Sequence, residues 1–211
     1  MHQPNEIFTE SQFNAMNEFY KTQNRWRRLK IYRKLPIGHV DNIFFGSSIM
    51  ESWPLHEFFP NNNILNRGVG GDTVDGLYFR MDEDIFRHTP DRVFMQIGLN
   101  GIDREFNDIL FRITTVAQMM KDREIKVWLS SILPLRYPDD WNRFQYQDKI
   151  VALNTELKKI GESKFAGFLD YHSKLKDETG QLAAEFAQKD GTHITIEGYC
   201  EMAKVVEPHL K

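Results

Sequence analysis

The chain has 211 residues, of which 41% are hydrophobic and 27% are charged. This length predicts one domain that buries a full core. The formal net charge of −3 argues against nucleic acid as a partner, because phosphate-binding domains are normally basic. The single cysteine, Cys200, excludes a disulfide framework and a cysteine-based metal site, and we interpret it as a small core or surface residue.

The first residues have neither the basic start nor the apolar stretch of a secretory signal. No segment approaches the roughly 18 consecutive apolar residues of a membrane helix. We therefore expect no membrane span and, by default, a cytoplasmic location.

Residues 1–36 are predicted to form a helical arm that precedes a domain of residues 37–211. Thr9 can cap a helix that runs to Lys34, and its apolar stripe comprises Phe13, Met16, Phe19 and Tyr20. The second half of the arm is basic. It is either a solvated face packed on the domain or a contact for an anionic polymer, a lipid surface or a partner such as a second copy of the chain.

Short apolar segments alternate with amphipathic ones along the rest of the chain. Strands are predicted at 42–45, 63–66, 92–97, 125–132 and 165–170, and helices from 49 and at 73–87, 105–123, 143–163 and 195–210. This alternation predicts an α/β fold, a three-layer α/β/α sandwich whose five-stranded parallel sheet has helices on both faces. We expect the flavodoxin-like strand order, and we expect the chemistry where strands end.

The first strand is followed by Gly46, Ser47 and Ser48. Ser48 could cap the next helix. Alternatively, it could present its Oγ above the sheet, with its own N–H directed at an oxyanion from the helix N-terminus. The nucleophile elbow G-x-S-x-G is absent, because Met50 occupies its last position.

Glycines and an asparagine follow the second and third strands. Gly68, Gly70 and Gly71 bring the backbone close to a neighbour, but neither nucleotide-binding glycine pattern matches. They form either a tight turn or a site where the Gly71 N–H meets a substrate oxygen. Asn100, after Gly98, is either a turn residue or an amide donor to an oxyanion.

Asp190 and His193 stand three residues apart before the last predicted helix. A histidine that acts as a general base needs a carboxylate at its Nδ1, so that Nε2 can accept a proton. A separation of three residues allows this within one turn. The alternative is a loop in which Asp190 or Thr195 only caps the helix.

Together, in this order, the four segments resemble the SGNH hydrolase family, also called GDSL esterases and lipases. The likeness extends from about residue 42 to 210. It implies that Ser48 is the nucleophile, His193 the general base and Asp190 its carboxylate partner. It also implies an oxyanion hole formed by Ser48, Gly71 and Asn100, and a reaction without metal or organic cofactor.

The chain departs from the family pattern at two positions. Ser47 and Gly101 replace aspartates that usually support the site through hydrogen bonds, which leaves open how Ser48 and Asn100 are positioned. Asp103 is a candidate replacement for the second aspartate. Ser47 is also a rival nucleophile, but Ser48 aligns with the family serine.

The resemblance implies a serine esterase that hydrolyses a carboxylic ester through an acyl-serine intermediate. The loop 134–142 offers Arg136 and Trp141 as substrate-binding residues, which suits a short-chain (acetyl) ester of a carbohydrate or similar small substrate. The loop could instead pack on its own aromatic residues. Two other functions stay open: transfer of the acyl group to a sugar hydroxyl, and a binding module that has lost catalysis.

Overall fold

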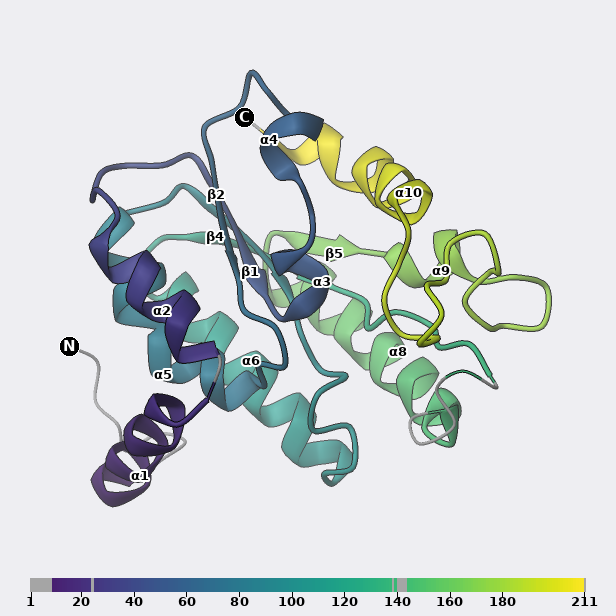
Figure 1. Cartoon of the computed structure of the whole chain (residues 1–211), viewed down its shortest axis with the longest axis horizontal. Helices are drawn as coiled ribbons and strands as arrows, with labels where there is room; N and C mark the ends of the chain where they lie inside the picture. Colours follow the sequence, from purple (N-terminus) through teal and green to yellow (C-terminus); the bar gives the residue numbers. More distant parts are fainter. Residues whose placement is uncertain (1–8, 24, 138, 140–143, 211) are drawn as a thin grey trace.

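The computed structural model describes residues 9–210 except 24, 138 and 140–143. Figure 1 shows a twisted sheet at the centre of the molecule, and all its strand pairs are parallel. The order β2-β1-β3-β4-β5 is the flavodoxin-like order, as the sequence predicts. The described strands are β1 (Asn42–Gly46), β2 (Ile64–Gly68), β3 (Arg92–Gln96), β4 (Lys126–Ser130) and β5 (Gly167–Leu169).

Helices cover both faces of the sheet, which confirms the three-layer prediction. One apolar core joins the sheet to α5 (Val74–Asp84), α6 (Phe106–Lys121) and α8 (Gln147–Lys164). The other joins it to α3 (Ser48–Glu51), α4 (Leu55–Phe58), α9 (Tyr171–Leu175) and α10 (Ile196–Val206). Along β1, Ile43 and Phe45 enter the first core and Phe44 the second, because successive side chains of a strand point to opposite faces. Two 3₁₀ turns, η1 (Phe86–His88) and η2 (Glu207–His209), complete the described elements.

The N-terminal arm forms two helices, α1 (Glu10–Lys21) and α2 (Arg25–Lys34), instead of the continuous helix that the sequence suggests. Both pack against α5 (Figure 1). Tyr20 and Leu29 enter the same apolar cluster. Nine residues of an unbroken helix would turn these two side chains to opposite sides. The break after α1 therefore lets both of them face the domain.

The start of α1 is as predicted. Thr9 caps the helix in a capping box with Gln12, each side chain accepting from the other's backbone N–H. The predicted apolar stripe faces inward only in part, since Tyr20 is buried and Phe19 is about half exposed. The side chain of Phe13 lies outside the described part of the structure.

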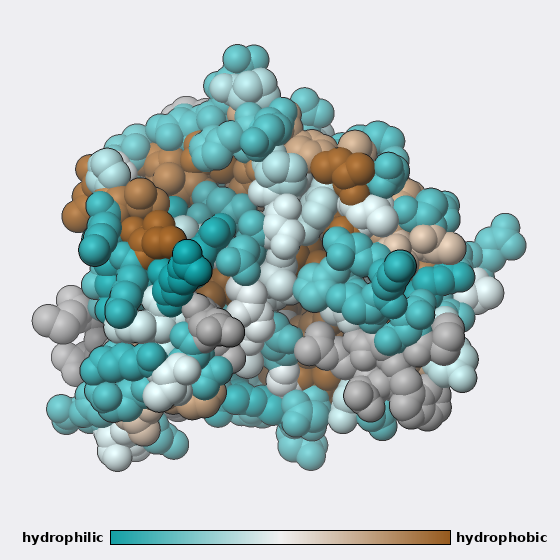
Figure 2. Space-filling view, in the orientation of Figure 1, coloured by the Kyte–Doolittle hydropathy of each residue, from teal (hydrophilic) through white to brown (hydrophobic). Residues whose placement is uncertain are grey.

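The surface over the arm is partly apolar. In the view of Figure 2 most of the face is hydrophilic, but a brown patch lies over α2 and its connection to β1, where Ile31, Leu35 and Ile37 are exposed. Within the described residues, no helix is long and apolar enough to cross a membrane.

Candidate active site

Ser48 is the first residue of α3, immediately beyond the carboxyl end of β1. Its Oγ lies 2.8 Å from Nε2 of His193. The interpretation of Ser48 as a helix cap is wrong, because the cap position is Ser47, whose side chain makes no capping hydrogen bond. Ser47 is also buried, and the histidine contacts Ser48, so the rival nucleophile is the less accessible of the two hydroxyls.

The loop before α10 joins Asp190 to His193 through side chain and backbone. Asp190 Oδ2 lies 2.5 Å from His193 Nδ1. The other carboxylate oxygen accepts the backbone N–H groups of Thr192 and His193 at 3.0 and 2.9 Å. Partial burial raises the pKa of Asp190, but these hydrogen bonds and the charge of His193 outweigh it and lower the pKa to about 2. Asp190 therefore stays ionised beside the imidazole at neutral pH.

The segment between β2 and α5 passes close to Ser48. Gly71 has φ 73, a conformation that favours glycine. The preceding Gly70 donates its N–H to Glu51 Oε2 at 2.7 Å, so the amide of Gly70 is used to hold the loop. Sequence reasoning missed Glu51, whose only signal is its position one helical turn after Ser48.

Asn100 approaches the same place from the loop after β3. Its Nδ2 donates to the backbone carbonyl of Asp72 at 2.8 Å, which orients the side-chain amide. Asp103, the suggested support, is exposed, and support of Asn100 by Asp103 stays a prediction. Gly101 has φ 86, where an aspartate would be strained. The backbone of this turn thus gives a conformational reason for glycine at position 101.

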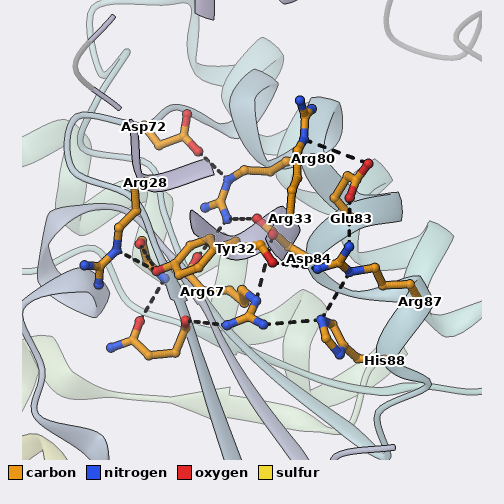
Figure 3. A network of polar contacts seen from close by, with 12 residues as sticks. Arg28, Tyr32, Arg33, Arg67, Asp72, Arg80, Glu83, Asp84, Arg87 and His88 are labelled. Carbon is orange, nitrogen blue, oxygen red and sulfur yellow. Dashed lines mark hydrogen bonds and ion pairs between the residues drawn. The ribbon is translucent and has the colours of Figure 1, made fainter. Parts of the chain in front are cut away.

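A buried arginine connects the strand ends that carry these groups (Figure 3). Arg80 donates from Nε to Asp72 at 2.8 Å and from Nη1 to Asp84 at 2.5 Å. It also donates to the backbone carbonyls of Gly46 and Arg67 at 2.9 and 2.8 Å. Its burial lowers its pKa, but the two aspartates outweigh this and raise it above the ordinary value. Arg80 therefore ties the end of β1 to the end of β2, a role that no sequence motif indicates.

Of the two predicted substrate-binding residues, the structure describes the contacts of Arg136. Arg136 donates from Nη1 to Asp177 at 3.1 Å and to the Leu182 carbonyl at 2.7 Å, while its backbone N–H donates to the Gly191 carbonyl at 2.8 Å. It thus holds the segments around the His193 loop. A substrate contact by Arg136 stays a prediction, and Trp141 lies outside the described residues.

A surface pocket of about 300 Å³ lies where the arm meets α3. It is lined by Arg27, Arg28, Ile31 and Glu51. Arg28 Nε lies 3.4 Å from Glu51 Oε1. Three of its four lining residues carry a charge, and Glu51 is the lining residue nearest in sequence to Ser48.

One cluster among the described residues has the composition of a metal site: His39, Asp41 and Asp91. The imidazole Nε2 lies 3.3 and 3.7 Å from the two carboxylates, distances that polar contacts among the three side chains also satisfy. The cluster lies where β1 and β3 begin, at the opposite end of these strands from Ser48. It has no place in the chemistry at Ser48.

Comparisons with known proteins find similarity to lipases, acylhydrolases and esterases. The sequence profile described as the GDSL-like Lipase/Acylhydrolase family matches residues 44–200. An arylesterase from Vibrio mimicus is 23% identical over 184 residues, which cover 83% of this chain and 86% of the relative. An acetylxylan esterase from Geobacillus stearothermophilus is 36% identical over 44 residues, 21% of this chain and 20% of that protein.

Among solved structures, a Streptococcus pneumoniae protein described as a platelet activating factor superposes with a TM-score of 0.78 at 26% identity. The match covers 95% of this chain and 99% of the other, so it extends into the N-terminal arm. The family profile, by contrast, begins only within β1.

Proposed function

This chain belongs to the GDSL-like lipase/acylhydrolase family and is an enzyme that hydrolyses esters, and from this premise we propose that Ser48, His193 and Asp190 form its catalytic triad. The observation that carries the proposal is the continuous contact from Asp190 Oδ2 to His193 Nδ1, at 2.5 Å, and from His193 Nε2 to Ser48 Oγ, at 2.8 Å. The contact between His193 and Ser48 joins two segments that are 145 residues apart in the sequence.

The reaction begins when Ser48 Oγ attacks the carbonyl carbon of the ester. His193 Nε2 takes the hydroxyl proton and returns it to the departing alcohol. Asp190 accepts the Nδ1–H, which fixes the tautomer and stabilises the imidazolium. Water, activated by the same histidine, then releases the acid from the acyl-serine.

The negative charge that develops on the carbonyl oxygen needs donors that are already in place. We assign this role to the N–H groups of Ser48 and Gly71 and to the side-chain amide of Asn100. The Gly70 N–H, which Glu51 accepts, is not part of this set. Orientation of Asn100 by the Asp72 carbonyl supports its inclusion.

We propose a short-chain, acetyl-type ester of a carbohydrate or similar small polar alcohol as the substrate. The short match to an acetylxylan esterase supports this class.

A fluorophosphonate probe tests the nucleophile. We expect mass spectrometry of the labelled peptide to find the adduct on Ser48, and Ser48→Ala to abolish labelling. Ser173→Ala, which changes an exposed serine in α9, serves as the matched control and should label like the wild type. Absence of labelling in folded wild-type protein, or an adduct on Ser47, would refute the proposed nucleophile.

A substrate panel tests the ester class. Aryl acetates and acetylated xylo-oligosaccharides should be turned over faster than aryl esters of eight-carbon acids, and free acid should accumulate. Acylated sugar formed in the presence of a sugar acceptor would instead identify an acyltransferase.

A further inference from the structure

The N-terminal arm packs directly on the segment that carries Gly71. Three buried arm residues, Tyr20, Leu29 and Tyr32, share an apolar cluster with Val69 and Phe79. Val69 lies inside the glycine-rich segment between β2 and α5 and is fully buried. The arm therefore covers the loop that supplies a proposed oxyanion donor, although the family profile does not include the arm.

Two tyrosine hydroxyls of the arm hold this segment at both of its ends. Tyr32 Oη donates to the Gly68 carbonyl at 2.8 Å, and Tyr20 Oη donates to Asp72 Oδ1. Both tyrosines are nearly inaccessible to solvent, and hydrogen bonds in such surroundings compete little with water.

Asp72 links its hydrogen bond from Tyr20 to the proposed oxyanion donors. Its Oδ2 accepts from Arg80 at 2.8 Å, and its carbonyl accepts from Asn100 Nδ2 at 2.8 Å. It also directly follows Gly71. A shift of Asp72 would therefore displace the carbonyl that holds Asn100 and the stretch of backbone that begins at Gly71.

A third contact reaches the same loop from α2. Arg28 lies 3.4 Å from Glu51, which accepts the Gly70 N–H at 2.7 Å. Arg28 is also 2.9 Å from the Tyr32 hydroxyl, so the two restraints from α2 are joined (Figure 3). The arm thus hydrogen-bonds the beginning and the end of the loop directly and reaches Gly70 through Glu51.

We propose that the arm is a working part of the active site, in which Tyr20, acting through Asp72, positions the oxyanion donors Gly71 and Asn100. Tyr20 is a positioning residue and touches no substrate. This inference rests on the proposed function, since it presupposes that Gly71 and Asn100 are the oxyanion donors.

Tyr20→Phe is the direct test, because it removes only the hydroxyl and keeps the ring stacked on Phe79, at 5.0 Å between centroids. Misplacement of donors that act only in the transition state should lower kcat by roughly 10- to 100-fold, with KM within about twofold of the wild type. Tyr171→Phe, which removes another fully buried tyrosine hydroxyl at the start of α9, in the second apolar core, is the matched control and should keep kcat within about twofold.

A second variant acts on the same contact without changing Tyr20. A Cβ added at Gly76 would overlap both Tyr20 Oη and Asp72 Oδ1, so Gly76→Ala must separate these groups. We expect the same fall in kcat at unchanged KM, measured on protein whose thermal unfolding is still cooperative.

A double variant distinguishes the positioning of Asn100 by Tyr20 from a general loss of stability. Asn100→Ala should cost roughly 10²- to 10³-fold in kcat as the loss of one oxyanion donor. In the double variant with Tyr20→Phe, the loss should be smaller than the product of the single losses, because both changes affect one group.

Wild-type kcat in Tyr20→Phe, a loss equal to that of Tyr171→Phe, or fully multiplicative losses in the double variant would each overturn the inference. These outcomes differ from failure of the proposed function, in which the wild-type protein itself would not label at Ser48.

Discussion

The two halves of the proposed site are built in opposite ways. On the proton-transfer side, His193 and Asp190 keep 35% and 50% of their side-chain surface exposed, and a single turn of chain joins them. On the oxyanion side, Asp72 and Arg80 are essentially inaccessible, and their partners come from β1, β2, α1 and the loop after β3. The first half is a local motif on the surface, whereas the second is part of the core.

Because of this difference, we expect catalysis and folding free energy to be coupled in the buried half of the site and not in the exposed half. Removing a group from the exposed half should cost catalysis and little folding free energy. Removing a group from the buried half should affect folding as well, because it leaves desolvated partners without their hydrogen bonds. Three experiments examine this contrast.

The largest expected effect is on turnover in the exposed half. Ser48→Ala or His193→Ala should lower kcat for an aryl acetate on the order of 10⁴-fold or more. The midpoint of thermal unfolding should stay close to that of the wild type, because neither side chain belongs to the apolar core. A comparable loss of stability in either variant would contradict the division between the two halves.

The next effect is on folding in the buried half. Arg80→Met keeps much of the side-chain volume but removes the cation that Asp72 and Asp84 share, so that Asp84 keeps Arg67 at 3.8 Å. This should cost about 3–5 kcal/mol in urea unfolding. The exposed pair of Lys204 and Glu201 supplies the control, since Lys204→Met should change stability by less than about 1 kcal/mol. Equal stability of the two variants would mean that the buried network contributes no more than a surface ion pair.

The smallest effect concerns the pH dependence of Asp190. Its pKa of about 2 lies below the ordinary value of 3.8. The stabilising contacts of the carboxylate are therefore fully present above the unfolded-state pKa, and they are lost only as the pH falls through about 2. Carboxyl ¹³C titration by NMR should find this midpoint near 2, with Asp190→Asn identifying the signal. A midpoint at or above 3.8 would show that the hydrogen bonds to His193 and Thr192 are not maintained.

The resemblance to the family and the strand pattern were sufficient to predict the sheet and its order, and they named the four segments of the proposed site. Hydrophobic periodicity is a local property, so strands such as β1 and β3 are readable directly. The pairing of Asp190 with His193 is also local, and so was visible as a spacing. Element ends were less well defined: β5 spans Gly167–Leu169, shorter than the predicted 165–170.

The contacts that support the site could not be predicted from local sequence patterns in this way. Arg80 in α5 looks like any charged helix residue in sequence, and only the packing of α5 against the sheet turns it inward. Tyr20 and Asp72 stand 52 residues apart, and the break between α1 and α2 that brings Tyr20 to the domain carries no proline or glycine. The carbonyl of Asp72 orients Asn100 where sequence reasoning could offer only Asp103.

By itself, then, the sequence determined the fold class, the family and the residues proposed to do the chemistry, because apolar periodicity and short motifs are recorded within a few neighbouring positions. Only the tertiary structure decided how the oxyanion side is held and that the arm takes part in it. Those contacts join distant segments inside a desolvated core, where the partner of each polar group depends on how whole helices pack and not on the residues beside it in the chain.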